Sequence, residues 1–331
     1  MAQTSDATAS EGAAGTASPK RWKLLLRLGV SVGLLVYLFR LVDGDALLDA
    51  FSRVRPEFVV AAYAVFVVGA IFGAAKWRLL ARAAGLDGTL GEFAGHYFVG
   101  QFFNVFGLGT VGGDVVRGLA LAGPRGRRGL ALNTVLADRV SGLMVLLAIA
   151  LVSLLLFRNY DLPAPVYWTT LALSAGLLAG WRIAPRVLPL VFARENSFRR
   201  LVEHDLAPYW NDWALLRRVS ALSALFHFSQ IAAMALLASG LHLAIPATYF
   251  FIFGPLVNIF SSLPISVNGL GIREGGYVFF LTHVGVARES AIAFALLYFG
   301  IVLASGLIGG VIILFRGRVR ASAETGRATS L

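Results

Sequence analysis

Long apolar runs, spaced along the whole chain, limit what this sequence can fold into more than any other feature. Each run holds about 17–25 residues, the length that an α-helix needs to cross the hydrocarbon core of a bilayer. Of the 331 residues, 57% are hydrophobic and 14% are charged, whereas a soluble domain has about 25% charged residues. The sequence therefore predicts an all-α, polytopic membrane bundle with full spans at 24–42, 58–75, 140–157, 166–183, 219–241 and 291–315.

The net charge and the cysteine content exclude several classes of function. A formal net charge of +11 is typical of nucleic-acid-binding proteins, but in a polytopic protein Lys and Arg collect in cytoplasmic loops near anionic headgroups. We therefore expect no nucleic-acid partner. The chain has no cysteine, which excludes disulfides and thiolate metal sites, and its five histidines show no metal-binding spacing. We expect neither a cofactor nor a bound metal.

The distribution of Lys and Arg predicts which loops face the cytoplasm. Only Arg53, Arg55, Arg158 and Arg288 fall in the loops assigned to the outer side. The positive-inside rule then predicts a multi-pass protein of the cell membrane with both termini in the cytoplasm. The second span is expected to return to the cytoplasm at Lys76. The predicted parts are a disordered tail at 1–19, a membrane domain at 20–316 with a basic amphipathic cytoplasmic segment at 184–218, and a cytoplasmic tail at 317–331.

Two further apolar segments, 93–121 and 249–284, are broken by glycines. If 93–121 crossed the membrane once, the basic turn at 124–128 would lie outside, whereas a segment that returns keeps this turn inside. Both segments are therefore predicted to be broken or re-entrant hairpins, giving about eight or more membrane segments in all. Two full helices in either segment stay an alternative. Hairpins that dip from opposite sides are typical of secondary transporters, and an inverted repeat stays open.

Charged residues fall within or beside these membrane segments. On the insertion scale each costs about 2.5–3.5 kcal/mol at a helix centre, so each needs a partner or access to water. One interpretation is that they form salt bridges that hold the bundle together. The other is a functional polar cavity, which the adjacent glycines favour because their backbone N–H groups could hold an anion. The residues concerned are Asp114, Arg117, Asp138, Arg139, Arg273 and Glu274.

Smaller signals predict packing rather than chemistry. GxxxG patterns at 69–73 and 306–310 predict close helix packing inside the bundle in preference to dimerisation. His227 is predicted to make a hydrogen bond between helices, and Asp138 and Arg139 are placed at the mouth of the span at 140–157.

Three motifs carry a resemblance to a known family. They are Gly112-Gly113-Asp114-x-x-Arg117, Asp138-Arg139-x-x-Gly142-Leu143 and Leu263-Pro264-x-x-x-x-Gly269-x-Gly271-x-x-Glu274. Together they resemble the transmembrane flippase-like domain of lysylphosphatidylglycerol synthases, over roughly residues 20–316. In the full synthases a soluble aminoacyl-transferase domain follows, whereas about fifteen residues follow the last span here. The resemblance therefore implies a chain that does not synthesise aminoacyl lipid and is not an enzyme.

The resemblance implies translocation, or flipping, of a polar-headgroup lipid between leaflets, such as an aminoacylated phospholipid or a polyprenyl-linked glycolipid. Membrane lipids with charged headgroups are then the expected partners, with a lipid synthase or glycosyltransferase as a further one. The alternatives are a membrane-embedded lipid-modifying enzyme and a non-catalytic membrane partner of such an enzyme. The predicted headgroup-binding residues are Asp114, Arg117, Arg273, Glu274, Gly112, Gly113, Asn268, Gly269 and Gly271. The predicted supporting residues are Asn104, Asp138, Arg139, Asn258 and Pro264.

Overall fold

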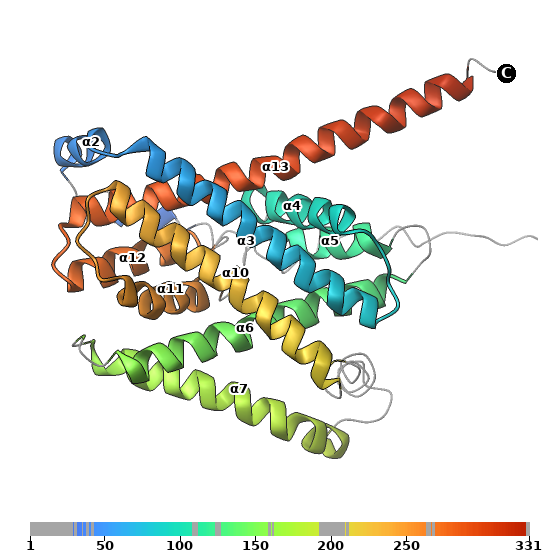
Figure 1. Ribbon diagram of the computed structural model, residues 1–331, viewed down its shortest axis with the longest axis horizontal. Helices are drawn as coiled ribbons and strands as arrows, with labels where there is room; N and C mark the ends of the chain where they lie inside the picture. The colour runs from blue at the N-terminus through green and yellow to red at the C-terminus, as the bar shows by residue number, and fades with distance from the viewer. Residues whose placement is uncertain are drawn as a thin grey trace, which may run out of the picture.

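The computed structural model describes residues 43–107, 112–122, 127–157, 162–191, 212–262 and 269–328, with a few isolated residues besides. Only the backbone is described for 177–178, 180–191 and 316–328. The tail at 1–19, most of the first predicted span and most of 184–218 lie outside the described residues, as do Pro264 and Asn268. Every element in the described part is an α-helix, which confirms the all-α prediction (Figure 1).

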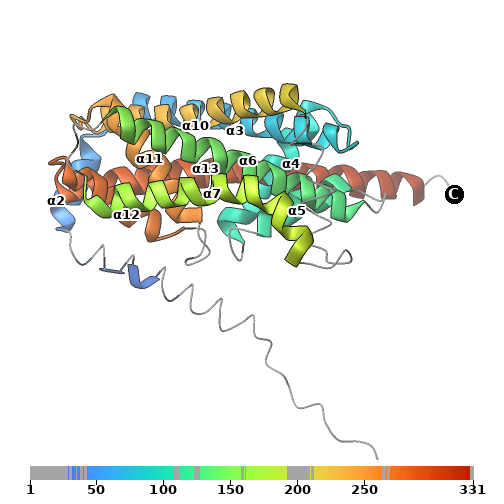
Figure 2. The same ribbon diagram turned by 90° about the horizontal axis from the view of Figure 1, so that it is seen from below.

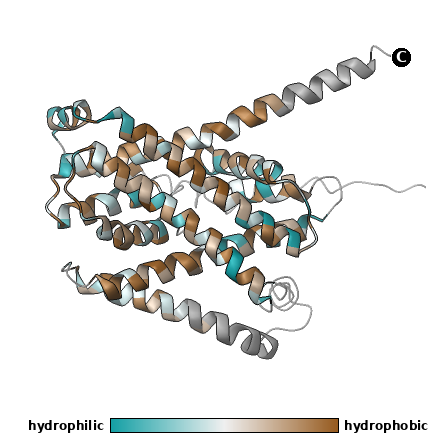
Figure 3. Cartoon of the chain, in the orientation of Figure 1, coloured by the Kyte–Doolittle hydropathy of each residue, from teal (hydrophilic) through white to brown (hydrophobic). Residues whose placement is uncertain are grey.

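Four helices are long and apolar enough to cross a membrane: α3 Pro56–Ala83, α6 Arg128–Leu156, α10 Trp213–Gly240 and α13, over Arg288–Phe315. Each has 28 or 29 residues, or about 42 Å at 1.5 Å per residue, against a hydrocarbon core of about 30 Å. Brown apolar residues cover most of their length in Figure 3. The predicted spans at 58–75, 140–157, 219–241 and 291–315 fall on these four helices, and 166–183 falls on α7 Ala164–Val191. α13 continues as a helix to Ala328.

Two of the helix boundaries that differ from the prediction move charges inward. α3 continues to Ala83, so Lys76 and Trp77 lie buried within the helix instead of in a cytoplasmic loop. α6 begins at Arg128, so Asp138 and Arg139 lie inside it and not at its mouth. In both cases apolar residues continue past the charged ones, and the helix continues with them.

The first glycine-broken segment folds into a helix pair. α4 Leu90–Phe106 starts at a capping box in which Thr89 accepts from the Glu92 backbone, and α5 Gly112–Ala122 packs back against it. The two backbones touch, since a Cβ atom on Gly113 would overlap the main-chain oxygen of Gly100. α5 has 11 residues, about 16 Å, which is shorter than the hydrocarbon core.

The second broken segment forms a matching pair, α11 Ala247–Ser262 and α12 Ile272–His283. The Tyr249 hydroxyl of α11 donates to the Phe280 main-chain oxygen of α12 at 2.9 Å. Gly276 lies against Val257, where a Cβ atom would be 3.0 Å from the Val257 side chain. α12 has 12 residues, so it too is about 18 Å long and shorter than the bilayer core.

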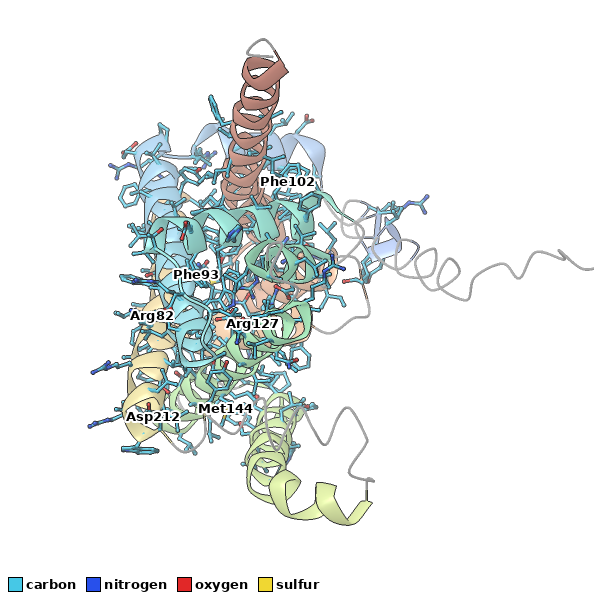
Figure 4. The ribbon with its side chains drawn as sticks, turned by 90° about the vertical axis from the view of Figure 1, so that its right-hand side faces the viewer. Arg82, Phe93, Phe102, Arg127, Met144 and Asp212 are labelled. Atoms are coloured by element: carbon cyan, nitrogen blue, oxygen red, sulfur yellow. The ribbon has the colours of Figure 1, made fainter. Side chains whose placement is uncertain are left out.

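The two pairs lie at opposite ends of the bundle, with α4 and α5 at one end and α11 and α12 at the other (Figures 1 and 2). α3 and α10 pack against each other and lie on one face of the bundle in Figure 2. Each pair packs on a long helix from the other half of the chain: α4 lies against α13, and α11 lies against α6. α5 packs on α6 as α12 packs on α13. Figure 4 faces the end that carries Arg82, Arg127 and Asp212, where α3 ends and α6 and α10 begin.

The glycines of the GxxxG patterns lie at contacts within the chain, which confirms their predicted role. On α13, Gly306 contacts Val105 of α4, and a Cβ atom on Gly309 would overlap the Phe98 main-chain oxygen. On α3, a Cβ atom on Gly69 would lie 2.9 Å from the Ser229 side chain of α10. Small residues here allow the helices to approach closely.

We expect Gly309→Ala to lower the stability of the protein, because the new Cβ must push α13 away from the α4 backbone. Overpacking of this kind costs about 1–3 kcal/mol. The matched control is Gly300→Ala on the same helix, where a Cβ would meet nothing within 4 Å. Thermal unfolding in detergent should show a lower midpoint for Gly309→Ala and an unchanged midpoint for Gly300→Ala. Equal midpoints for the two variants would contradict the close packing of α4 on α13.

Candidate functional site

Five charged side chains from α3, α5 and α6 form one continuous network. Lys76 Nζ lies 3.0 Å from Asp138 Oδ1, and Arg117 Nη2 lies 2.9 Å from Asp138 Oδ2. Arg117 Nε lies 3.1 Å from Asp114 Oδ1, and Arg139 Nε lies 2.7 Å from Asp114 Oδ2. The charges alternate from Lys76 through Asp138, Arg117 and Asp114 to Arg139. We call these five residues the five-charge network.

The five-charge network runs from the interior of the bundle to its surface. The side chains of Lys76, Asp138 and Arg117 are 6%, 6% and 4% exposed. Asp114 is 15% exposed and Arg139 is 53% exposed. A polar group outside the bundle can therefore reach Arg139 first, whereas Lys76 lies at the closed end.

Glycines bring the three helices close enough for these contacts. Asp114 and Arg117 share one face of α5 because they are three residues apart. Gly118 brings α5 against α6, where a Cβ would lie 2.9 Å from Leu132. Lys76 reaches α6 beside Gly142 and donates to the Asp138 main-chain oxygen at 2.8 Å.

Aromatic rings cover the Arg117 guanidinium. Its central carbon lies 4.8 Å from the Trp77 ring centroid and 5.1 Å from that of Tyr97. Trp77 is itself held by a 3.0 Å hydrogen bond from its Nε1 to Thr134 Oγ1. Arg117 Nη1 is buried and has no hydrogen-bond acceptor among the described residues. One edge of the guanidinium therefore stays unpartnered.

A second, smaller cluster lies at the start of α12. Arg273 Nη2 donates to Glu274 Oε1 at 3.0 Å, and the two side chains are 9% and 4% exposed. The Arg273 guanidinium also lies over the Phe299 ring of α13, 5.3 Å from its centroid. No ion pair or hydrogen bond between described residues joins this cluster to the five-charge network. The structure thus groups the six predicted charges as four and two.

Two of the backbone N–H groups that we predicted to form an anion cradle are already used. The Gly113 N–H donates to Asn104 Oδ1 at 2.9 Å, and the Gly271 N–H donates to Glu274 Oε2 at 2.6 Å. The cradle does not form at these two groups, because side chains of the chain itself accept from them. Gly112 is open, and a Cβ there would meet nothing within 4 Å.

The other predicted residues shape the second pair. Gly269 and Gly271 have φ angles of +72° and +84°, so both adopt a left-handed conformation that favours glycine. Asn258 is half-buried near the end of α11, and its main-chain oxygen accepts from Ser262 Oγ at 2.6 Å. Pro255, which the sequence analysis did not single out, lies inside α11.

Polar residues of α10 contact both α6 and α13. His227 Nε2 lies 3.1 Å from the Gly142 main-chain oxygen on α6, which confirms the predicted hydrogen bond between helices. One turn further along, Gln230 Oε1 accepts from the Tyr298 hydroxyl of α13 at 3.2 Å.

Lys76 is the functional candidate that sequence reasoning missed. It lies one residue past the predicted end of its span, where the positive-inside rule assigns a lysine to the cytoplasm. The signal that could have found it is the apolar stretch at 79–81, which continues the helix past the lysine.

The comparison with protein families decides what this chain is related to. The family model described as the lysylphosphatidylglycerol synthase TM region matches residues 24–310. The chain belongs to this family. The match contains both helix pairs and both charge clusters, and it confirms the resemblance carried by the three motifs. None of the curated proteins and none of the solved structures matches the chain.

Proposed function

We propose that this member of the lysylphosphatidylglycerol synthase TM-region family moves lipids with polar headgroups from one membrane leaflet to the other and is not an enzyme. The observation that carries the proposal is the five-charge network, which lies inside an apolar bundle and opens to the surface at Arg139. Charges within membrane segments are costly and typically mark the path of a polar substrate. The headgroup would follow the charges while the lipid tails stay in the bilayer.

The two helix pairs support a transporter in preference to a static scaffold. Short helix pairs that start from opposite ends are the arrangement in which secondary transporters place their substrate sites. We propose that α4–α5 and α11–α12 are re-entrant hairpins related by an inverted repeat, because α4 packs on α13 as α11 packs on α6. Six full spans would then complete the bundle, including α7 and residues 24–42.

The proposed topology places the protein in the cell membrane with both termini in the cytoplasm. It places the end with Arg82 and Arg127 on the inner side, as the positive-inside rule favours. Membrane lipids are the proposed partners, and a lipid synthase or glycosyltransferase would supply them. Within this proposal Asp114, Arg117, Arg273 and Glu274 contact the headgroup.

Reconstitution in liposomes tests this function. Wild-type protein is expected to expose headgroup-labelled lipid of the inner leaflet to a quencher added outside, whereas protein-free liposomes keep that fraction protected. Arg273→Ala and Glu274→Gln are expected to keep the inner-leaflet label protected from the quencher. Each removes a proposed headgroup contact and leaves a buried charge without its partner. Arg55→Gln, which breaks an exposed ion pair with Glu57, is the matched control and should scramble like the wild type.

Two results would contradict a part of the proposal or the whole of it. Equal scrambling by all variants would remove Arg273 and Glu274 from the lipid path. A wild type that moves no labelled headgroup but changes the mass of added lipids would show a membrane-embedded lipid-modifying enzyme instead.

A further inference from the structure

The five-charge network carries one more positive charge than negative charge. Three cations, Lys76, Arg117 and Arg139, alternate with two carboxylates, Asp114 and Asp138. Each of the four carboxylate oxygens contacts one cation. In the described part of the chain no other acid forms an ion pair with any of the five. The chain of charges starts and ends with a cation, which leaves a surplus of one.

The two inner cations of the network, Lys76 and Arg117, lie where charge is expensive. A lysine or arginine at the centre of a membrane helix costs about 2.5–3.5 kcal/mol unless it is paired or hydrated. Arg117 is buried and one of its nitrogens, Nη1, lacks an acceptor among the described residues. The Arg117 guanidinium carbon lies over the Trp77 and Tyr97 rings, and an acceptor for Nη1 must lie along its N–H directions, in the plane of the guanidinium. An acceptor that satisfies both features is an anion with a single charge and oxygen atoms.

We propose that the five-charge network is a binding site for the phosphodiester of a lipid headgroup. A phosphodiester carries one negative charge shared by two oxygens, which matches the surplus of one and the planar fork of arginine. Arg139 would meet the phosphate at the surface, and the Nη1 edge of Arg117 would bind it inside. This inference rests on the proposed lipid movement for its biological role, but the binding itself can be measured without transport.

Lys76 is a positioning residue in this proposal, since it acts through Asp138 and not on the phosphate. Its charge engages one oxygen of Asp138, so that this carboxylate does not neutralise Arg117 alone. Without Lys76 the network would hold two cations and two carboxylates and have no net charge. Two variants test this role. Lys76→Met removes the charge and keeps the length of the side chain, and Lys76→Arg keeps the charge.

Equilibrium binding in detergent tests the proposal. A tail-labelled phosphatidylglycerol is bound to the purified full chain and displaced by one of three competitors: unlabelled phosphatidylglycerol, an uncharged glucosyl diacylglycerol or inorganic phosphate. Wild-type protein is expected to prefer phosphatidylglycerol over the glycolipid by at least about tenfold, or 1.4 kcal/mol. Lys76→Met should lose this preference and Lys76→Arg should retain it. Displacement by inorganic phosphate would assign recognition to the phosphate alone, whereas displacement by phosphatidylglycerol only would assign it to the lipid-borne diester.

A second variant keeps the test decisive if Lys76→Met fails to fold. Arg139→Gln removes the cation at the exposed end, also leaves the network neutral and costs little stability because Arg139 is 53% exposed. It should lose the same preference, and Arg55→Gln, at an exposed ion pair, should not. Equal affinity of the wild type for phosphatidylglycerol and glycolipid, or an unchanged preference in Lys76→Met and Arg139→Gln, would overturn the proposal. Wild-type preference without any lipid movement would instead retain the binding site and reject the proposed function.

Discussion

Asp138→Asn is expected to unfold the protein in detergent, whereas Lys76→Met, which breaks the same ion pair from its other side, is expected to leave it folded. Asp138 lies between Lys76 and Arg117, so the asparagine leaves two buried cations without their shared carboxylate. The net charge of the five-charge network rises from one to two. Removing one partner of a buried pair costs about 3–5 kcal/mol, which is comparable with the stability of a typical domain, about 5–15 kcal/mol.

Lys76→Met has the opposite effect on the net charge. Asp138 keeps Arg117 as its partner at 2.9 Å, and the network becomes neutral. The remaining cost is the lost hydrogen bond to the Asp138 main-chain oxygen and one unpaired carboxylate oxygen, about 1–3 kcal/mol. Thermal unfolding and gel filtration should therefore separate the two variants clearly. Arg53→Gln, at an exposed pair with Asp49, controls for loss of any positive charge. Similar losses in Asp138→Asn and Lys76→Met would show that the network is an ordinary set of salt bridges whose net charge has no consequence.

Gly113→Ala is expected to disrupt the α4–α5 pair, and Gly112→Ala, one residue earlier, is expected to be tolerated. A Cβ on Gly113 would overlap the Gly100 main-chain oxygen and lie 2.6 Å from Asn104 Oδ1. The two backbones must then separate, which breaks the hydrogen bond from the Gly113 N–H to Asn104 and shifts Arg117 on the same helix. Overpacking typically costs about 1–3 kcal/mol, and occasionally more.

The measurement is the unfolding midpoint together with phosphatidylglycerol binding in detergent. Gly113→Ala should lower both, and Gly112→Ala should change neither, because a Cβ at Gly112 meets nothing within 4 Å. The reverse order of sensitivity would contradict the close contact between the α4 and α5 backbones at Gly113.

The sequence contains most of what is needed to predict the helices and less of what is needed to predict their contacts. Apolar runs place α3, α6, α10 and α13 because burying unpaired backbone in lipid is so costly that only helices remain. Glycines at 107, 112 and 113 and at 269 and 271 lie beside the break between the two helices of each short pair. These features are local, so a pattern in one stretch of sequence is sufficient to recognise them.

The partners of the buried charges are not local, and this is where the prediction was incomplete. The cost of burying Asp138 is visible in the sequence, but Lys76, 62 positions earlier, is not identifiable as its partner. Arg139, which is adjacent to Asp138 in the sequence, contacts Asp114 of α5. Likewise the glycine N–H groups looked available until Asn104 and Glu274 were found to accept from two of them.

The exchange of contacts between the two halves has a mechanical consequence. α4 packs on α13 and α11 packs on α6, so each half of the chain holds the short helix pair of the other half. Separating the halves as rigid bodies would break both helix contacts at once, including the close contact at Gly309. For the proposed lipid movement, we therefore expect a short helix pair to slide against the opposite half of the chain, while α3 and α10 stay packed together. Neither half of the chain on its own contains the complete main hydrophobic core.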